Sequence, residues 1–180
     1  MAEVRFLRLG VDDPRDPTFD SGDAHLNAFF FEHSRISSRE LLSVSYAWNL
    51  GDKTVAFFSV SNDAVPIDKV TRRNWFWRKF PNGKRLTIMP AIKIGRFAVA
   101  SDCRRAGHGT QVMDFIKLWF ITGNKTGCRF IILDALNNPA AITFYESNGF
   151  RFLNVADAGE PTRLMYFDLM EIARHSGAMR

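Results

Sequence analysis

The run Arg104-Arg105-Ala106-Gly107-His108-Gly109-Thr110 has the residue types of a loop that holds an anion. Two glycines one residue apart let backbone N–H groups come close to a bound group. The apolar segment 111–122 follows and is typical of a helix, whose N-terminus adds the positive end of its dipole. The run therefore predicts a phosphate site, and an ordinary tight turn is the alternative for this loop taken alone.

A second set of candidate residues follows the apolar run 127–135. Asn138-Pro139 is typical of a helix start, and the helix that it predicts ends at Asn148-Gly149. Within it, Tyr145 is a candidate general acid, because a phenol with a pKa of roughly 10 can give up its proton as negative charge develops nearby. Packing of this ring in the core is the alternative interpretation.

Strands are expected to position both sets. The alternating segment 92–99 predicts a strand before the loop, and 127–135 predicts a strand buried on both faces. Because a helix separates them, they are expected to be parallel. The rest of the chain predicts the following elements: an edge strand over 4–9, a helix from Asp20 or Ser21 to His33, a short helix over 35–42, a hairpin of 43–50 and 54–60, a long loop over 63–90, closing strands over 150–153 and 162–169, and a frayed tail over 170–180.

Length and composition limit the classes of protein. The 180 residues, 46% of them apolar, predict a single domain over 1–180. No run approaches the ~18 apolar residues of a membrane span, and the N-terminus lacks the apolar core of a signal peptide, so a cytoplasmic location is expected. Cys103 and Cys128 are expected to be free thiols, and no metal-binding spacing is present.

The net charge of +5 is concentrated in one stretch. Residues 69–101 hold nine basic residues and no acidic one, which leaves 15 basic and 19 acidic residues elsewhere. Aromatic residues interleave with them at 75–80, a composition typical of RNA binding, although a solvated loop is the alternative. The candidate polyanion-binding residues are Arg72, Arg73, Arg78, Lys79, Lys84, Arg85, Lys93 and Arg96.

The two motifs together resemble the GNAT (GCN5-related) acetyltransferases, which use acetyl-coenzyme A (acetyl-CoA). Their pyrophosphate loop has Arg or Gln, two residues, Gly, one residue, and Gly or Ala, which here are Arg104, Gly107 and Gly109. Their later motif has Asn, two residues, Ala, three residues, Tyr and a nearby Gly-Phe, which here are Asn138, Ala141, Tyr145 and Gly149-Phe150. The resemblance covers 92–152, about a third of the chain.

This resemblance implies an α/β (mixed α+β) GNAT fold: a mixed, mostly antiparallel sheet with a splayed parallel strand pair, flanked by helices. In such enzymes the pantetheine arm lies between the splayed strands and pairs with exposed backbone. The implied cofactor-binding residues are Phe97, Ala98, Val99, Arg104, Arg105, Ala106, Gly107, His108, Gly109, Thr110, Asn138, Ala141 and Tyr145.

The resemblance also implies direct attack of a neutral amine on the thioester. Tyr145 would protonate the leaving thiolate, and the backbone N–H of Val99 would meet the oxyanion. Many relatives carry a Glu base on the central strand, but 69–101 has no acid, so this role is vacant. Asp134 and Glu146 would have to act through water, and neither is assigned the role. An α-amino group on an ester needs little help, whereas a lysine with a pKa of ~10.4 needs more.

A second resemblance concerns the acceptor. Phe19-Asp20-Ser21-Gly22, Leu26 and 93–99 are similar to stretches of the acetyltransferase toxins of bacterial toxin–antitoxin pairs, with Ser21 in place of their usual Cys. Those toxins acetylate the α-amino group of aminoacyl-tRNA, so tRNA and an antitoxin are implied partners, and a homodimer is expected. The alternatives are an acetyltransferase of a small-molecule or protein amine, and a catalytically inactive RNA- or protein-binding module. A nucleotide phosphate-binding protein ranks last, because the Gly-Lys-Ser/Thr ending of a P-loop is missing.

Overall fold

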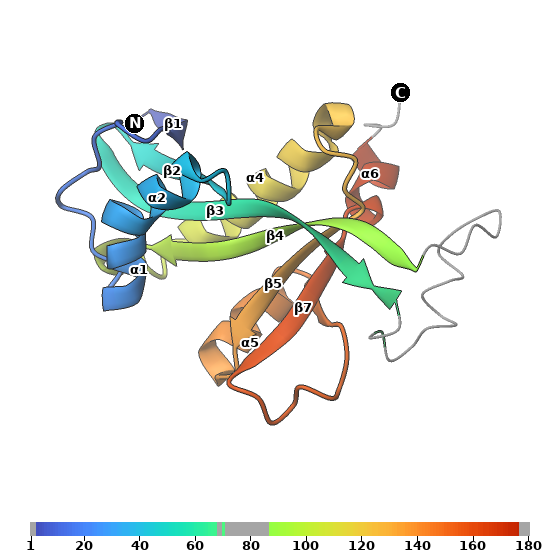
Figure 1. Ribbon diagram of the computed structural model, residues 1–180. Coiled ribbons are helices and arrows are strands. Elements are labelled where there is room, and N and C mark those ends of the chain that lie inside the picture. The colour runs from blue at the N-terminus through green and yellow to red at the C-terminus, as the bar shows by residue number, and fades with distance from the viewer. Residues whose placement is uncertain (1–2, 68–69, 71–86, 177–180) are drawn as a thin grey trace. The chain divides into compact units, whose positions relative to one another are not determined.

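The computed structural model describes residues 3–67, 70 and 87–176 (Figure 1). In chain order the elements are β1 (Val4–Leu9), α1 (Ala24–Ala28), the π-helical turn η1 (Phe29–His33), α2 (Ser34–Arg39), β2 (Val44–Leu50), β3 (Lys53–Pro66), β4 (Ile88–Val99), the 3₁₀ turn η3 (Ser101–Cys103), α4 (His108–Ile121), η4 (Thr122–Asn124), β5 (Phe130–Leu136), α5 (Pro139–Ser147), β6 (Arg151–Phe152), β7 (Thr162–Asp168) and α6 (Met170–Ser176).

The described strands form a seven-stranded sheet in the order β1-β2-β3-β4-β5-β7-β6. Strands β4 and β5 are parallel, and the pairs β1–β2, β2–β3, β5–β7 and β6–β7 are antiparallel. The predicted fold class, a mixed and mostly antiparallel sheet with helices, is therefore confirmed. The chain divides into two compact units, residues up to Ser61 with Ile94–Phe115, and Asn62–Lys93 with the residues from Ile116 onward. The single domain stays a prediction.

The first unit is built on the predicted hairpin. Strand β2 pairs with β3 around a turn in which Gly51 has a φ of 61°, a left-handed conformation that glycine adopts readily. Phe30 and Phe57 are fully buried, and their ring centroids are 5.1 Å apart. Ala98, near the end of β4, belongs to the same apolar cluster. Because each buried ring contributes roughly 1.5 to 3 kcal/mol, this cluster holds the helical segment against β3 and β4.

The helical segment of the first unit begins later than the sequence predicts. Its N-cap is Asp23, whose carboxylate accepts hydrogen bonds from the backbone N–H groups of His25 and Leu26 at 2.9 and 3.0 Å. Asp20 and Ser21, the predicted caps, lie before it, and the Asp20 carboxylate accepts from the Gly22 N–H at 2.7 Å. The two predicted helices are one continuous segment, residues 24–39, that includes the π-helical turn η1.

A buried arginine ties the polar stretch after β1 to this segment. The Arg15 guanidinium donates to the carbonyl oxygens of Asp13 at 2.9 Å, Gly10 at 3.1 Å and Phe30 at 3.2 Å. Buried charge is costly unless its donors are satisfied, and these three carbonyls satisfy them. Nothing in the local sequence pattern around Arg15 predicts this role.

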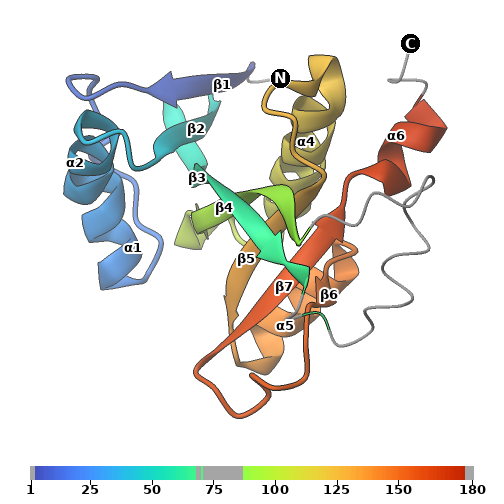
Figure 2. The same cartoon turned by 45° about the vertical axis from the view of Figure 1, so that its right-hand side comes forward.

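The second unit carries the parallel pair and the closing strands, as predicted. Ala91–Lys93 of β4 pair with Phe130–Ile132 of β5, and β5 pairs with β7 from Phe130↔Asp168 to Leu136↔Thr162. Figure 2 shows β5 and β7 side by side, and α5 packs against β5. The short β6 lies on the other side of β7.

Two predictions for this unit need correction. Strand β3 continues to Pro66 and β4 begins at Ile88, so the predicted long loop is shorter at both ends, and 68–69 and 71–86 lie outside the described residues. Of the tail predicted to be frayed, residues 170–176 form the helix α6, whose Met170 N–H donates to Asp168 at 3.1 Å and whose Ala173 is buried, and 177–180 lie outside the described residues. No helix in the described part of the chain is long and apolar enough to cross a membrane.

We expect Asp168→Ala to lower the free energy of unfolding by about 3 kcal/mol, because it removes one partner of a buried ion pair. Arg129 donates to the two Asp168 oxygens at 2.6 and 3.1 Å, and the Asp168 side chain is only 2% exposed. The control is Arg151→Ala, whose pair with Glu171 is exposed, so its expected cost is below ~1 kcal/mol. Urea unfolding measures both, and equal costs would refute this assignment.

Candidate active site

The predicted anion-binding loop connects η3 to α4 in the first unit. Arg105 has a φ of 62°, which is uncommon for a residue other than glycine, and Gly107 has a φ of 82°. A Cβ on Gly107 would meet no heavy atom within 4 Å, so the conformation and not the space requires glycine here. Left-handed residues at such turns make concavities lined by backbone N–H groups, which bind anions.

Helix α4 begins three residues earlier than predicted, and this places the second glycine of the motif inside its first turn. Its start is marked by the Gln111 N–H, which donates to the Gly107 carbonyl oxygen at 3.1 Å. The N–H groups of His108, Gly109 and Thr110 precede that bond, and amides in this position have no acceptor within a helix. These donors, together with the open space beside Gly107, fit a pyrophosphate group.

A segment far away in the sequence braces the loop. The Arg104 guanidinium donates to the carbonyl oxygen of Ser21, and the Ser101 N–H donates to the carbonyl oxygen of Asp20 at 2.8 Å. Ser21 is fully buried, and its hydroxyl donates to Oδ1 of Asn27 at 2.7 Å. The stretch that resembles the toxins by sequence therefore positions the first residue of the loop motif, a contact that sequence reasoning missed.

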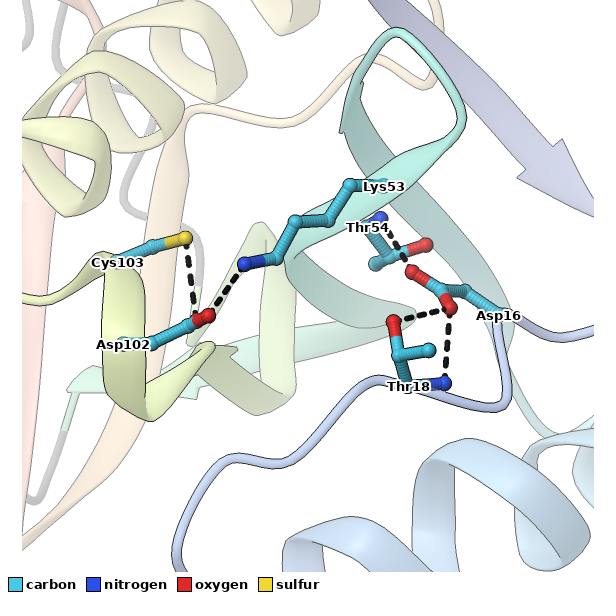
Figure 3. A network of polar contacts seen from close by, with 6 residues as sticks. All are labelled: Asp16, Thr18, Lys53, Thr54, Asp102 and Cys103. Carbon is cyan, nitrogen blue, oxygen red and sulfur yellow. Dashed lines mark hydrogen bonds and ion pairs between the residues drawn. The ribbon is translucent and has the colours of Figure 1, made fainter.

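The 3₁₀ turn before the loop is held by a second polar network (Figure 3). The Asp102 carboxylate pairs with the Lys53 ammonium and accepts from the Cys103 thiol at 3.3 Å. Burial, and then the hydrogen bond to Asp102, raise the pKa of the Cys103 thiol. Beside Lys53, the Thr54 N–H donates to Asp16 at 2.7 Å. The network links the loop to the start of β3 and keeps the thiol protonated.

We expect Cys103→Ser to keep the acetyl transfer that the resemblance implies within about twofold of the wild-type rate, because a thiol with a raised pKa is a poor nucleophile. Serine retains a donor for Asp102, so the turn is preserved. The measurements are the steady-state rate and the extent of iodoacetamide labelling at neutral pH. A rate that falls more than about tenfold, together with inactivation by alkylation, would instead assign a covalent role to this thiol.

The three strand residues that are expected to bind acetyl-CoA, Phe97, Ala98 and Val99, lie at the end of β4. Ala98 is buried, whereas Phe97 and Val99 are partly exposed. The parallel ladder joins Ala91–Lys93 to β5, while β4 continues beyond it to Val99 and then leads through η3 into the loop. One continuous stretch of the first unit therefore carries both the strand and the loop parts of the predicted donor site.

Asn138, Ala141 and Tyr145 lie in the second unit, on or at the start of α5. Asn138 is the N-cap, and its Oδ1 accepts from the Ala141 N–H at 2.9 Å, so Ala141 takes part through its backbone. The Tyr145 ring lies edge-on to Phe144 and Phe150, with centroids 5.2 and 5.8 Å away. Burial raises the pKa of Tyr145 to about 12. The phenol is therefore a weaker acid than the free side chain and stays protonated at neutral pH.

The remaining candidates separate into paired and exposed groups. Lys93 Nζ lies 2.5 Å from an oxygen of Asp134, so this lysine and one of the two candidate bases neutralise each other. Glu146 and Arg96 are exposed. The predicted polyanion-binding residues Arg72, Arg73, Arg78, Lys79, Lys84 and Arg85 lie outside the described residues.

Comparisons with known proteins agree with this geometry. The model of the acetyltransferase (GNAT) domain matches residues 71–152, which include both motifs. A comparison with curated proteins gives no match.

Similar solved structures cover nearly the whole chain. AtaT complexed with acetyl-methionyl-tRNAfMet is 20% identical, with a TM-score of 0.78, covering 96% of this chain and 99% of that one. A tyrosine-to-phenylalanine mutant of the AtaT toxin, bound to the C-terminus of the antitoxin AtaR and acetyl-CoA, is 19% identical, with a TM-score of 0.67 and coverages of 96% and 97%. A tyrosine-to-phenylalanine mutant of KacT is 20% identical, with a TM-score of 0.74 and coverages of 96% and 98%.

Fold, loop geometry and domain match agree. The solved structures share the fold over almost the full length of the chain. The domain match includes the loop of Arg104 to Thr110 and the helix that carries Tyr145. The chain has the fold of the GNAT acetyltransferases, and residues 71–152 match their domain model.

Proposed function

We propose that this enzyme transfers the acetyl group of acetyl-CoA to the α-amino group of an aminoacyl-tRNA. The observation that carries the proposal is the absence of any carboxylate from residues 69–101, which include all of β4. Because this strand supplies no base to remove a proton from the amine, the acceptor is expected to be an amine that is already neutral. An α-amino group, with a pKa of about 8, is substantially neutral near pH 7.5, whereas only about one lysine in a thousand is.

Two similar structures support the choice of acceptor and partner. One is AtaT complexed with acetyl-methionyl-tRNAfMet, and the other is an AtaT mutant with the C-terminus of its antitoxin and acetyl-CoA. We extend both relations to this chain as proposals: tRNA as the acceptor and an antitoxin protein as a partner. A cytoplasmic location, where charged tRNA is used, and a homodimer complete the proposal.

Donor binding is assigned to three sets of residues. The backbone N–H groups of Arg104 to Thr110 hold the pyrophosphate, since the first turn of α4 offers donors without helical acceptors. The backbone of Phe97, Ala98 and Val99 pairs with the pantetheine arm in the manner of an added strand. Asn138, whose Oδ1 caps α5, contributes its side-chain N–H group.

The chemistry needs few protein groups, because acetyl-CoA supplies an activated carbonyl carbon. The Val99 N–H donates to the carbonyl oxygen as negative charge develops on it. The Tyr145 hydroxyl donates its proton toward the departing sulfur, and the proton that the amine nitrogen loses as the amide forms restores the phenol by way of solvent. Because burial keeps this phenol protonated, the donor is in the correct state throughout the pH range in which an α-amino group becomes neutral.

A screen of acceptors with labelled acetyl-CoA tests the proposal. Charged tRNA, uncharged tRNA, a lysine peptide and small primary amines are compared at equal concentration. We expect label on charged tRNA alone, at a rate that falls steeply with salt as phosphate contacts are screened. Label on the peptide or on small amines alone would favour the second candidate, an acetyltransferase of a protein or small-molecule amine. Saturable acetyl-CoA binding with no transfer to any acceptor would favour an inactive binding module.

A further inference from the structure

Arg96 on β4 stands apart from the other basic residues of the first unit, because its guanidinium is exposed and rests on an aromatic ring. Its Cζ lies 5.4 Å from the centroid of the Phe29 ring, and its Nη1 donates to the carbonyl oxygen of Gly95 at 2.7 Å. No carboxylate of the described residues lies within ion-pair distance of it. It therefore presents uncompensated positive charge in a defined place.

Three other arginines of the first unit donate hydrogen bonds to backbone carbonyl oxygens within the fold. Arg15 donates to three carbonyl oxygens, Arg35 donates to those of Val11 and Phe31, and Arg104 donates to that of Ser21. Lys93, three residues before Arg96 on the same strand, is paired with Asp134. Of the two predicted polyanion-binding residues that the structure describes, only Arg96 has its charge available for a ligand.

The Phe29 ring on which Arg96 stacks is held in place by its neighbours. Phe29 stacks on the fully buried Phe57, with centroids 6.2 Å apart and an angle of 12° between the rings. Phe29 also opens the π-helical turn η1, in which the Ser34 N–H reaches back five residues to its carbonyl oxygen. Such turns occur frequently at functional sites. A guanidinium stacked on a fixed ring loses less freedom on binding, and its N–H edge remains available to a planar or tetrahedral anion.

Arg96 also lies at a suitable distance from the reacting position. It directly precedes Phe97, Ala98 and Val99, the residues assigned to the donor. Since a strand rises about 3.3 Å per residue, the Cα atoms of Arg96 and Val99 are about 10 Å apart. In an aminoacyl-nucleotide the α-amino group and the 5′ phosphate are separated by the ester and the ribose, a length of the same order.

We propose that Arg96, seated on Phe29, binds the phosphate of the 3′-terminal nucleotide of the acceptor and so places the aminoacyl group at Val99. The inference rests on the proposed function and deepens it, because it assigns the acceptor end of the site to two named side chains. Arg96 is a specificity residue, which distinguishes an aminoacyl-nucleotide from an amine that carries no phosphate.

The test compares two acceptors that share the amine and differ in the phosphate: an aminoacyl-tRNA and the methyl ester of the same amino acid. For Arg96→Ala we expect kcat/KM to fall about 10- to 100-fold on the tRNA and to be unchanged on the ester, because a charge-assisted hydrogen bond is lost only with the tRNA. Arg96→Lys should recover part of the loss, since it keeps the charge without the planar fork. Arg39→Ala, which removes an exposed arginine of α2, is the matched control and should change neither value.

Two results would overturn the inference: equal kcat/KM on tRNA for Arg96→Ala and wild type, or an equal loss on both acceptors. Phe29→Leu should also lower kcat/KM on tRNA, with circular dichroism confirming that the variant is folded. If the wild-type enzyme transfers nothing to tRNA, the proposed function fails separately. The phosphate contact is then tested by the binding of an RNA minihelix with a single-stranded 3′ end, measured by fluorescence anisotropy. If Arg96 binds the phosphate, Arg96→Ala should bind this RNA more weakly than the wild type.

Discussion

Replacing Tyr145 by phenylalanine is expected to lower kcat about 100- to 10,000-fold, the usual contribution of a positioned proton donor. The ring packs edge-on against Phe144 and Phe150, and phenylalanine keeps this packing while removing only the hydroxyl. Acetyl-CoA affinity, measured by titration calorimetry, should therefore be unchanged. Undiminished turnover would remove Tyr145 from the mechanism, and lost acetyl-CoA binding would assign it to the donor site instead.

The pH dependence of kcat/KM for the acceptor distinguishes this role further. Burial raises the pKa of Tyr145 to about 12, so the protonated phenol that the mechanism needs persists as the pH rises and is lost only near that value. The amine must lose a proton to react. We therefore expect a single rise in rate near the pKa of the acceptor amine and no decline up to about pH 10 in the wild-type enzyme. A decline centred near pH 8 would require an acid other than Tyr145.

The second large effect concerns the loop. Gly107→Ala is expected to raise the KM for acetyl-CoA more than about tenfold with little change in kcat, because a left-handed conformation at a residue with a Cβ costs about 1 to 2 kcal/mol and distorts the donors. The open space around Gly107 means that conformation and not a clash causes the loss.

Gly123 offers a matched control for this substitution. It has a φ of 68° and also has no heavy atom within 4 Å of an added Cβ, but it lies at the other end of α4, in η4. Gly123→Ala should lose a similar free energy of unfolding without any change in the KM for acetyl-CoA. If both variants raise KM equally, the loop loses its assigned role.

Much of this architecture follows from local sequence patterns. The hairpin of β2 and β3, the parallel β4 and β5, and the antiparallel β7 each follow from alternation, continuous apolar runs or an intervening helix. The loop of Arg104 to Thr110 and the cap of α5 by Asn138 follow from glycine spacing and from Asn-Pro chemistry. These features depend on neighbours in the sequence, so one sequence suffices to predict them.

The features that sequence reasoning missed depend on contacts between distant residues. Ser21 and Arg104 meet although 83 positions separate them, and Lys53 and Asp102 meet across 49. The first N–H of helix α6, that of Met170, donates to Asp168, a residue also held by Arg129, so the start of this helix depends on a contact made outside it. The stacking of Arg96 on Phe29 belongs to the same class. Stabilisation by tertiary contacts leaves no local pattern to detect.

The proposed strand and loop residues of the donor site, Phe97 to Thr110, lie on one stretch of the first unit, and Arg96, the proposed acceptor-phosphate residue, directly precedes them. The hydrogen bonds of Arg104 to the Ser21 carbonyl oxygen and of Lys53 to Asp102 then have a functional reason. They hold the loop that is proposed to bind the pyrophosphate, at the end of the same strand that carries Arg96. Substitutions that remove these hydrogen bonds are expected to lower the affinity for acetyl-CoA, because they change the position of the loop.

Acetyl transfer to the α-amino nitrogen of an aminoacyl-tRNA is tested most directly by mass spectrometry of the product. Charged tRNA is incubated with the enzyme and acetyl-CoA, and nuclease then releases the 3′-terminal aminoacyl-adenosine. We predict that this fragment gains one acetyl group on its α-amino nitrogen with wild-type enzyme, and much more slowly with Tyr145→Phe. An unmodified aminoacyl-adenosine, under conditions in which the same enzyme acetylates a lysine peptide or a small amine, would contradict the account.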